Sequence, residues 1–130
     1  MDPAAIVVEA LGDVVEISAD ADGDQSFSYD GVAGFIQHGW LGAVELLTIT
    51  CVAAMAHPWG PALDRWLVTR NAAMLLGGIV AVGEGDTADL LVRYCLPSAG
   101  LDPAGLRAVL LPVIAAAADV RQELAAGAAT

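Results

Sequence analysis

The longest stretch of the chain without a charged residue, from Leu46 to Leu63, constrains the fold most. Residues 45–55 are rich in Leu, Ile, Val and Thr at consecutive positions, which predicts a strand at the centre of a sheet. Residues 57–61 contain two prolines and a glycine, which should end this strand and let Pro61 begin a helix. A membrane span needs about 20 mostly apolar residues. The polar and turn-forming residues in this stretch therefore favour a strand, a turn and a helix start over a span.

The rest of the sequence predicts three helices and the other strands of an antiparallel sheet. Asp2-Pro3 and Asp102-Pro103 each supply an N-cap and a proline at the first helical position, and Asp30-Gly31 is a typical two-residue hairpin turn. The expected helices are residues 4–11, 61–74 and 103–125, the last kinked at Pro112. The expected strands are residues 26–29, 32–38, 45–55, 79–82 and 89–96, with a turn around Trp40 at residues 39–43 and, at residues 14–18, either a lead-in to the first strand or an extra strand. We therefore expect one α+β domain over residues 1–130, in the order α-β-β-β-α-β-β-α, with an antiparallel sheet of about five strands packed against helices.

Charge is distributed unevenly along the chain. Residues 1–64 carry ten of the sixteen acidic residues and no base, while all five bases are arginines in the second half. The net charge of −11 argues against nucleic acid and anionic membranes as partners, because both bind through clustered Lys or Arg. A basic segment of another protein is compatible with this charge. The N-terminal residues are acidic, unlike a signal peptide, so we expect a cytoplasmic protein with two reduced thiols, Cys51 and Cys95.

Three acidic residues have the spacing of the first ligands of a calcium loop. Asp20, Asp22 and Asp24 would occupy positions one, three and five. However, Gln25 stands where the loop needs a glycine, and Gly31 stands where it needs a bidentate glutamate. We therefore expect a solvated acidic turn and no metal site.

The sequence contains no catalytic motif. Cys51 and His57 could formally make a nucleophilic pair, but Cys51 lies within the predicted core strand, where a thiol is inert. The segment from Gly83 to Asp86 has no Lys or Ser after it and is typical of a hairpin turn, not of a phosphate-binding loop. We therefore expect no enzyme activity and no cofactor.

The residues from Glu45 onward resemble the YbjN family, which shares its fold with type III secretion chaperones of the Tir-chaperone (CesT) type. The shared pattern is a central apolar strand, a helix ending near an asparagine, a strand with glycine, a strand ending in Leu-Pro and a terminal helix. In this chain these are Leu46–Cys51, Pro61–Asn71, Gly77–Val80, Arg93–Pro97 and the helix after Asp102-Pro103. The resemblance implies a convex antiparallel sheet packed on helices, a homodimer without enzyme activity and, as in the secretion chaperones, apolar patches that hold an extended partner segment.

These observations favour a protein-binding module, either chaperone-like or regulatory. We expect it to hold a basic or apolar extended segment of another protein along the sheet face or edge. The candidate partner-binding residues are Phe27, Tyr29, Phe35, Asp20, Asp22 and Asp24. The candidate homodimer contacts are Leu63, Trp66, Arg70 and Trp59, because Trp and Arg are favoured at interfaces. The alternative is a small-ligand sensor or small enzyme with a pocket between sheet and helices.

A first prediction concerns calcium. Replacing Asp20, Asp22 and Asp24 together with Asn should leave the difference in melting temperature between calcium and chelator at zero, as in the wild-type chain, because the loop lacks two essential parts. Thermal unfolding in both buffers measures this. A wild-type melting temperature that rises with calcium and no longer rises in the variant would contradict the prediction.

Overall fold

The sheet is organised around strand β4 (Val44–Pro58), as the computed structural model of residues 2–130 shows. Strand β4 pairs on one side with β3 (Val32–Leu41) and on the other with β6 (Thr87–Pro97), and both pairings are antiparallel. Its side chains alternate between a fully buried row, which includes Leu47 and Ile49, and a half-buried row on the opposite face. The predicted central strand is thus confirmed.

The remaining elements complete an α+β fold in the predicted class. The sheet has six strands in the order β1-β2-β3-β4-β6-β5, so the chain order is α-β-β-β-β-α-β-β-α and exceeds the predicted one by the short strand β1. The other elements are α1 (Pro3–Leu11), β1 (Ser18–Ala19), β2 (Gln25–Tyr29), α2 (Pro61–Ala72), β5 (Gly78–Val82) and α3 (Pro103–Ala125). Asp2 and Asp102 cap α1 and α3 as the Asp-Pro pairs predict.

Two local predictions in the N-terminal third need correction. The extra strand considered at residues 14–18 begins only at Ser18, in β1, because the N–H groups of Val14 and Val15 both donate to the carbonyl of Leu11 and wind the chain into a turn after α1. The turn predicted at residues 39–43 is shorter, since β3 continues through Trp40 and the chain reverses only after Leu41. By contrast, Asp30 and Gly31 both have positive φ angles, which confirms the predicted hairpin turn between β2 and β3.

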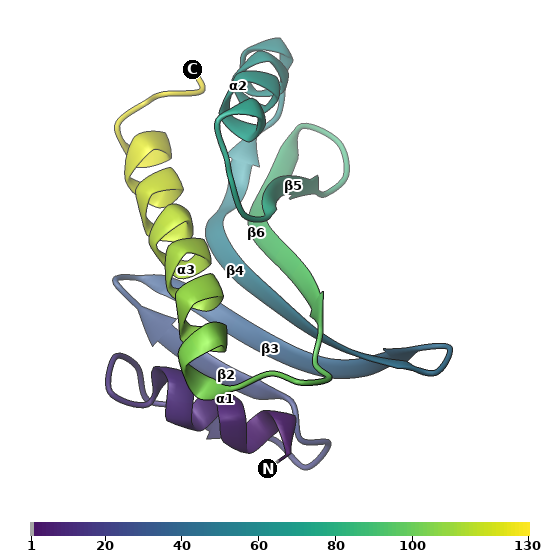
Figure 1. The fold of residues 1–130 in the computed structure, drawn as a ribbon. Coiled ribbons are helices and arrows are strands. Elements are labelled where there is room, and N and C mark those ends of the chain that lie inside the picture. The colour runs from purple at the N-terminus through teal and green to yellow at the C-terminus, as the bar shows by residue number, and fades with distance from the viewer. Residues whose placement is uncertain (1) are drawn as a thin grey trace.

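The helices cover one face of the sheet (Figure 1). Helix α3 runs diagonally across β3, β4 and β6, α1 packs beside its first half, and α2 lies at the end of the sheet that carries β5. Helix α3 is long and apolar enough to cross a membrane by length and composition, but eight of its residues are buried, as in the core helix of a folded domain. It continues through Pro112, whose exposed position leaves the unpaired carbonyl one turn earlier accessible to water.

Phe27 and Gly34 pack against each other on the helix-covered face, where they pair across β2 and β3. The Phe27 ring is only 7% exposed, and it lies where a side chain at position 34 would be. Gly34 has no positive φ, so glycine is needed here for space and not for backbone conformation.

Gly34→Ala should therefore lower the free energy of unfolding by roughly 1–3 kcal/mol, because the added methyl group overpacks the core. Gly39→Ala is the matched control in the same strand, since no atom lies within 4 Å of a Cβ built there. It should change stability by less than about 0.5 kcal/mol. Urea unfolding of both variants measures the difference, and equal stabilities would contradict the packing argument.

The two cysteines lie on opposite faces of the sheet. Cys51 of β4 is fully buried, and burial raises the pKa of its thiol to about 12. Cys95 of β6 is exposed, and its Sγ accepts a hydrogen bond from the Thr48 hydroxyl at 3.4 Å. A thiol with so high a pKa is almost entirely protonated at neutral pH and is a poor nucleophile.

A thiol reagent at neutral pH should therefore modify one cysteine per native chain, Cys95. Cys51 should react only after denaturation, when its pKa returns to the ordinary range. Mass spectrometry of native and denatured protein counts the modified thiols, with Cys95→Ser as the control that should remain unmodified in the native state. Rapid modification of Cys51 in native Cys95→Ser would show that the buried thiol is accessible.

Candidate partner-binding surface

The face of the sheet opposite the helices is uncovered. Cross-strand register places Phe35, Thr50 and Arg93 in one row across β3, β4 and β6. The Phe35 side chain is 44% exposed, and Arg93 is exposed as well. This surface thus combines an aromatic ring, a hydroxyl group and a cation, and we call it the open face.

The acidic turn between β1 and β2 is held in shape by its own carboxylates. Asp20 Oδ1 accepts hydrogen bonds from the N–H groups of Asp22 at 2.9 Å and Asp24 at 3.0 Å. Asp24 Oδ1 accepts one from the N–H of His38 at 3.2 Å, which fixes the turn to β3. Two of the three acids therefore stabilise a turn that borders the open face.

Two hollows are lined by residues of this turn, and a third lies further along β2. The first, of about 410 Å³, joins the turn to the open face, because Asp20, Asp24, Phe35 and Thr50 all line it. A second hollow of about 200 Å³ is lined by Asp22, Trp40 and Glu45 among others, together with the start of α1. A third hollow of about 480 Å³ lies along β2 and is lined by Glu16, Ser18, Ser26, Phe27 and Ser28. The first hollow brings together three of the six predicted partner-binding residues.

The three predicted aromatic residues do not share one face. Phe27 is buried and Tyr29 is half-buried, and both pack with the core under the helices. Phe35 lies on the opposite face, because Phe35 pairs with Ser26, a position of β2 that alternates with Phe27. The prediction of a common aromatic surface therefore needs correction: Phe35 alone of these three is on the open face.

Sequence reasoning missed the exposed edge of β2. Strand β1 pairs only with Gln25 and Ser26, so it does not reach Ser28. Tyr29 and Val32 close the two-residue hairpin, and hydrogen-bonded positions alternate along an antiparallel pair, so the N–H and C=O of Ser28 point away from β3. The alternation of Ser26 and Ser28 with aromatic residues was the available signal, but it did not show how short β1 is.

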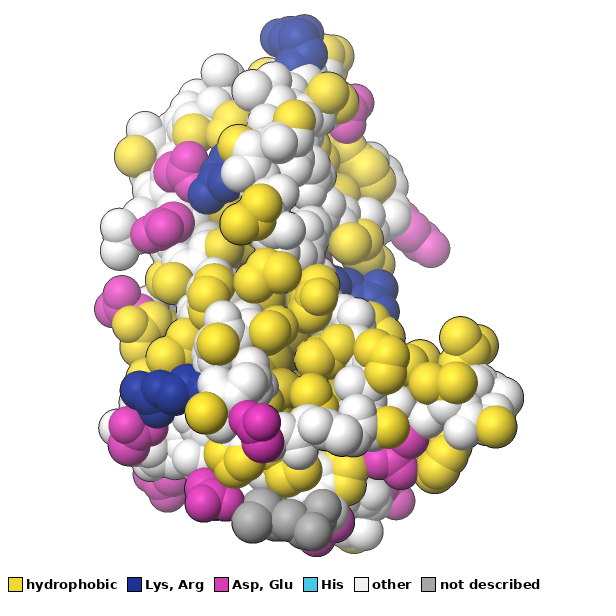
Figure 2. Space-filling model, in the orientation of Figure 1, with side chains coloured by type: hydrophobic (Ala, Val, Ile, Leu, Met, Phe, Trp, Pro, Cys, Tyr) yellow, Lys and Arg dark blue, Asp and Glu magenta, His cyan; other side chains and the backbone are white. Residues whose placement is uncertain are grey.

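A second missed feature is the tip of the β3–β4 hairpin. Trp40, Leu41 and Val44 are 68%, 70% and 47% exposed there. In Figure 2 this hairpin extends from the body of the molecule at the right and carries hydrophobic side chains. These residues flank the turn at Gly42, which lies within the predicted range of residues 39–43.

Helix α1 is fastened to the sheet at its start by buried polar contacts. Gln25 is 3% exposed, and its Nε2 donates to the carbonyl of Ala4 at 3.0 Å. The Gln25 Oε1 atom is 2.9 Å from His38 Nε2, so His38 must donate from that nitrogen. These contacts place the start of α1 beside the second hollow.

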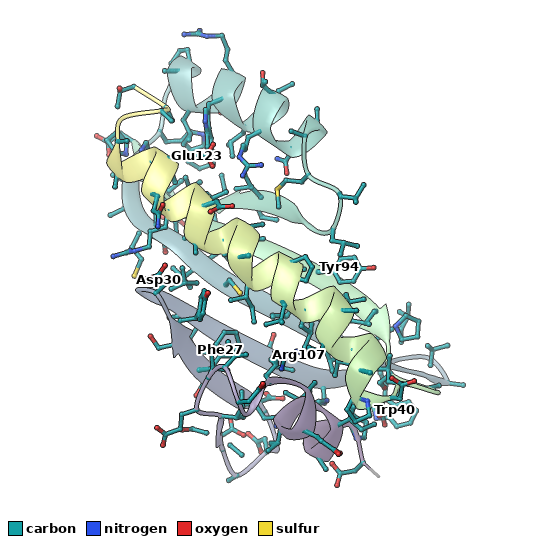
Figure 3. All side chains as sticks on the ribbon, turned by 60° about the vertical axis from the view of Figure 1, so that its left-hand side comes forward. Phe27, Asp30, Trp40, Tyr94, Arg107 and Glu123 are labelled. Carbon is teal, nitrogen blue, oxygen red and sulfur yellow. The ribbon has the colours of Figure 1, made fainter. Side chains whose placement is uncertain are left out.

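At its other end, α1 is fastened to α3 by Arg107, which Figure 3 shows between the two helices. Its guanidinium donates to the carbonyl of Ala10 at 3.1 Å and to the carboxylate of Asp13. The hydrogen bond from Arg107 is the main reason why the pKa of Asp13 lies below its ordinary value. A cation at the C-terminal end of α1 also interacts favourably with the helix dipole.

The predicted dimer contacts mostly serve the protomer itself. Leu63 is 1% exposed and lies in the core, so it cannot contact a second copy from that position. Trp59 donates from Nε1 to Asp64 at 2.9 Å, and Arg70 forms a 3.0 Å ion pair with Glu123. Trp66 is half-buried against the core.

Within residues 2–130, the structure contains no group of three or more His, Cys, Asp or Glu side chains that could hold a metal ion. The acidic turn and the edge of β2 instead offer carboxylates, an aromatic ring and backbone groups. These are the groups with which a protein surface recognises a basic or extended chain.

Comparison with solved structures identifies the fold. The chain is similar to a chain of the ExsC–ExsE complex, with a TM-score of 0.62 and 15% identity over 92% of this chain and 90% of that one. It is also similar to the structure of the Yersinia pestis type III secretion chaperone SycH in complex with a stable fragment of YscM2, with a TM-score of 0.56 and 16% identity over 92% of this chain and 99% of that one. No family model and no curated protein sequence matches, so the resemblance to the YbjN family stays a prediction. The protein has the fold of the type III secretion chaperones.

Proposed function

We propose that this protein is a non-enzymatic binding module, chaperone-like or regulatory, that holds an extended segment of another protein. The observation that carries the proposal is the first hollow, which joins Asp20 and Asp24 to Phe35 beside the exposed edge of β2. Both similar solved structures are complexes, one of ExsC with ExsE and one of SycH with a fragment of YscM2, which supports a protein as the partner.

The edge of β2 supplies the main-chain part of the recognition. A segment that adds as a strand would pair with the N–H and C=O of Ser28, which lie next to the third hollow. Main-chain hydrogen bonds provide affinity that does not depend on the sequence of the partner. It would therefore suit a partner that is extended before binding.

Side chains around the first hollow supply selectivity. Phe35 offers an exposed apolar contact, while Asp20 and Asp24 attract a cationic residue of the partner. Exposed charges are screened by salt, with a Debye length of about 8 Å at physiological ionic strength. Binding should therefore be strongest for a segment that combines apolar and basic residues, and it should weaken as salt is added.

We also propose that the protein acts inside the cell as a homodimer. Val68 of α2 and Leu75, in the loop after α2, are 74% and 97% exposed. A second copy packed on this end of the molecule would cover these apolar side chains, which lie close to the predicted contacts Trp66 and Arg70. Trp59, which packs partly against the core at the start of α2, borders the same end of the molecule.

A small-ligand sensor or enzyme would need a pocket between the sheet and the helices. Most of that layer is filled by fully buried side chains such as Leu47, Ile49, Leu110 and Val113. A hollow of about 360 Å³ lies between the end of β4 and the end of α3, and it is open to solvent. The three hollows near β2 are open surface depressions as well, which suits a polypeptide better than a small enclosed ligand.

The proposed edge can be tested with a displayed library of short random peptides selected on the wild-type protein. The selected peptides should be enriched in Arg and Lys alternating with apolar residues. Ser28→Pro removes the outward N–H of β2 and should weaken these peptides on the order of tenfold, and Phe35→Ser should weaken the apolar ones. Fluorescence anisotropy at low and high salt measures both effects.

The matched control is Ala81→Pro, which places proline at an outward-facing position of β5, on the opposite edge of the sheet. It should leave peptide affinity unchanged. Peptides that bind Ser28→Pro as tightly as wild type, or that lose affinity with Ala81→Pro instead, would exclude the β2 edge as the site. Circular dichroism and urea unfolding establish that each variant is folded.

A further inference from the structure

The opposite edge of the sheet, strand β5, has the sequence of a strand that associates readily. Residues 78–82 read Gly-Ile-Val-Ala-Val, without a charge or a proline, and Val80 and Val82 are 37% and 50% exposed. An apolar, uncharged edge strand is a template for pairing with another chain, and natural proteins commonly block such edges with lysine, proline or a bulge. The chain contains no lysine at all.

The side chain of Asn71 occupies this edge. Its Oδ1 accepts a hydrogen bond from the N–H of Ile79 at 2.6 Å, and its Nδ2 donates to the carbonyl of Ile79 at 3.2 Å. These are the two backbone groups that a neighbouring strand would use. Both point away from β6, so Ile79 and its partner Val92 form a non-hydrogen-bonded pair of the ladder.

The backbone around Asn71 leaves room for its side chain to approach β5 closely. Asn71 lies at the end of α2, where its own carbonyl accepts from the N–H of Met74 at 3.1 Å. A Cβ at position 78 would lie only 3.2 Å from Asn71 Oδ1, so Gly78 leaves the space that the amide needs. Gly77 has a φ of +76°, and a Cβ there would lie 2.6 Å from the carbonyl oxygen of Arg93. Gly77 and Gly78 thus allow the chain to enter β5 directly beside the side-chain amide of Asn71.

A carboxamide is the side chain that can imitate a strand in this way. It has one acceptor and one donor in a plane, like a peptide group, whereas a carboxylate has no donor for the Ile79 carbonyl. Because outward-facing positions alternate, Ala81 is the next residue of β5 whose N–H and C=O face the edge. With Ile79 occupied, the exposed edge is too short to hold a strand.

We propose that the Asn71 carboxamide is a surrogate strand that closes the β5 edge and prevents it from pairing with β5 of a second copy. The occupant that it excludes is the antiparallel β5 of another molecule, since that strand is apolar and uncharged. This role of Asn71 does not depend on the proposed function at the β2 edge. The β2 edge of the sheet thus stays open, and the β5 edge is closed.

Asn71→Leu and Asn71→Ala test the proposal, because both remove the two hydrogen bonds to Ile79. Hydrogen exchange of the Ile79 amide should become on the order of tenfold faster in Asn71→Leu. Light scattering should show assemblies larger than the wild-type species, which grow with concentration in both variants. Adding Ala81→Pro, which removes the other outward N–H of β5 and places a proline on the edge, should return the mass to that of wild type.

Ala72→Leu is the matched control, because it adds the same apolar side chain at the next position, which is exposed, without touching β5. It should keep the wild-type mass. A wild-type mass for both Asn71 variants at every concentration would overturn the proposal, and so would assemblies that persist with Ala81→Pro. If Asn71→Leu does not fold, Asn71→Ala decides by the same measurements, and failure of both to fold would show that Asn71 serves folding instead.

Discussion

The alternation of side chains along β4 is the constraint on which the rest of the structure depends. Leu47, Ile49 and Cys51 point to one face and are fully buried, while the residues between them are only half-buried on the other. Burying one face requires a helix layer, which α3 and α1 supply. The opposite face then stays uncovered, because no other element of residues 2–130 packs on it.

The two edges of this sheet differ in whether their outward-facing backbone groups are paired. At β2 a two-residue strand covers the edge incompletely and leaves Ser28 beyond its reach, beside a hollow that the Glu16 carboxylate also lines. At β5 a single carboxamide, that of Asn71, satisfies both outward groups of Ile79. A sheet that binds an extended segment, as we propose for this one, gains specificity if only one of its edges can accept a strand.

Much of the fold could be predicted from local patterns, and the candidate site only in part. The Asp-Pro helix starts, the Asp30-Gly31 hairpin and the apolar central strand depend on neighbouring residues, and all are present. Of residues 14–18 only Ser18 belongs to a strand, because the carbonyl of Leu11 accepts hydrogen bonds from the N–H groups of Val14 and Val15 at the end of α1, although both residues favour strands intrinsically. For the site, the acidic turn was found, whereas the edge at Ser28 was missed because its exposure depends on where β1 ends.

The sequence by itself determined the fold class, the acidic N-terminal half and the identity of the central strand, because period, capping and charge are local properties. Only the tertiary structure decided which face of each strand the helices cover. That decision buried Phe27, exposed Phe35 and placed Asp20 and Asp24 beside it. It also brought Asn71, at the end of α2, onto the edge of β5, a contact between side chain and strand that no residue pattern expresses. Such features depend on distant segments that meet only in the folded chain. Side chains of a strand alternate between two faces, and tertiary packing decides which of these faces the helices bury.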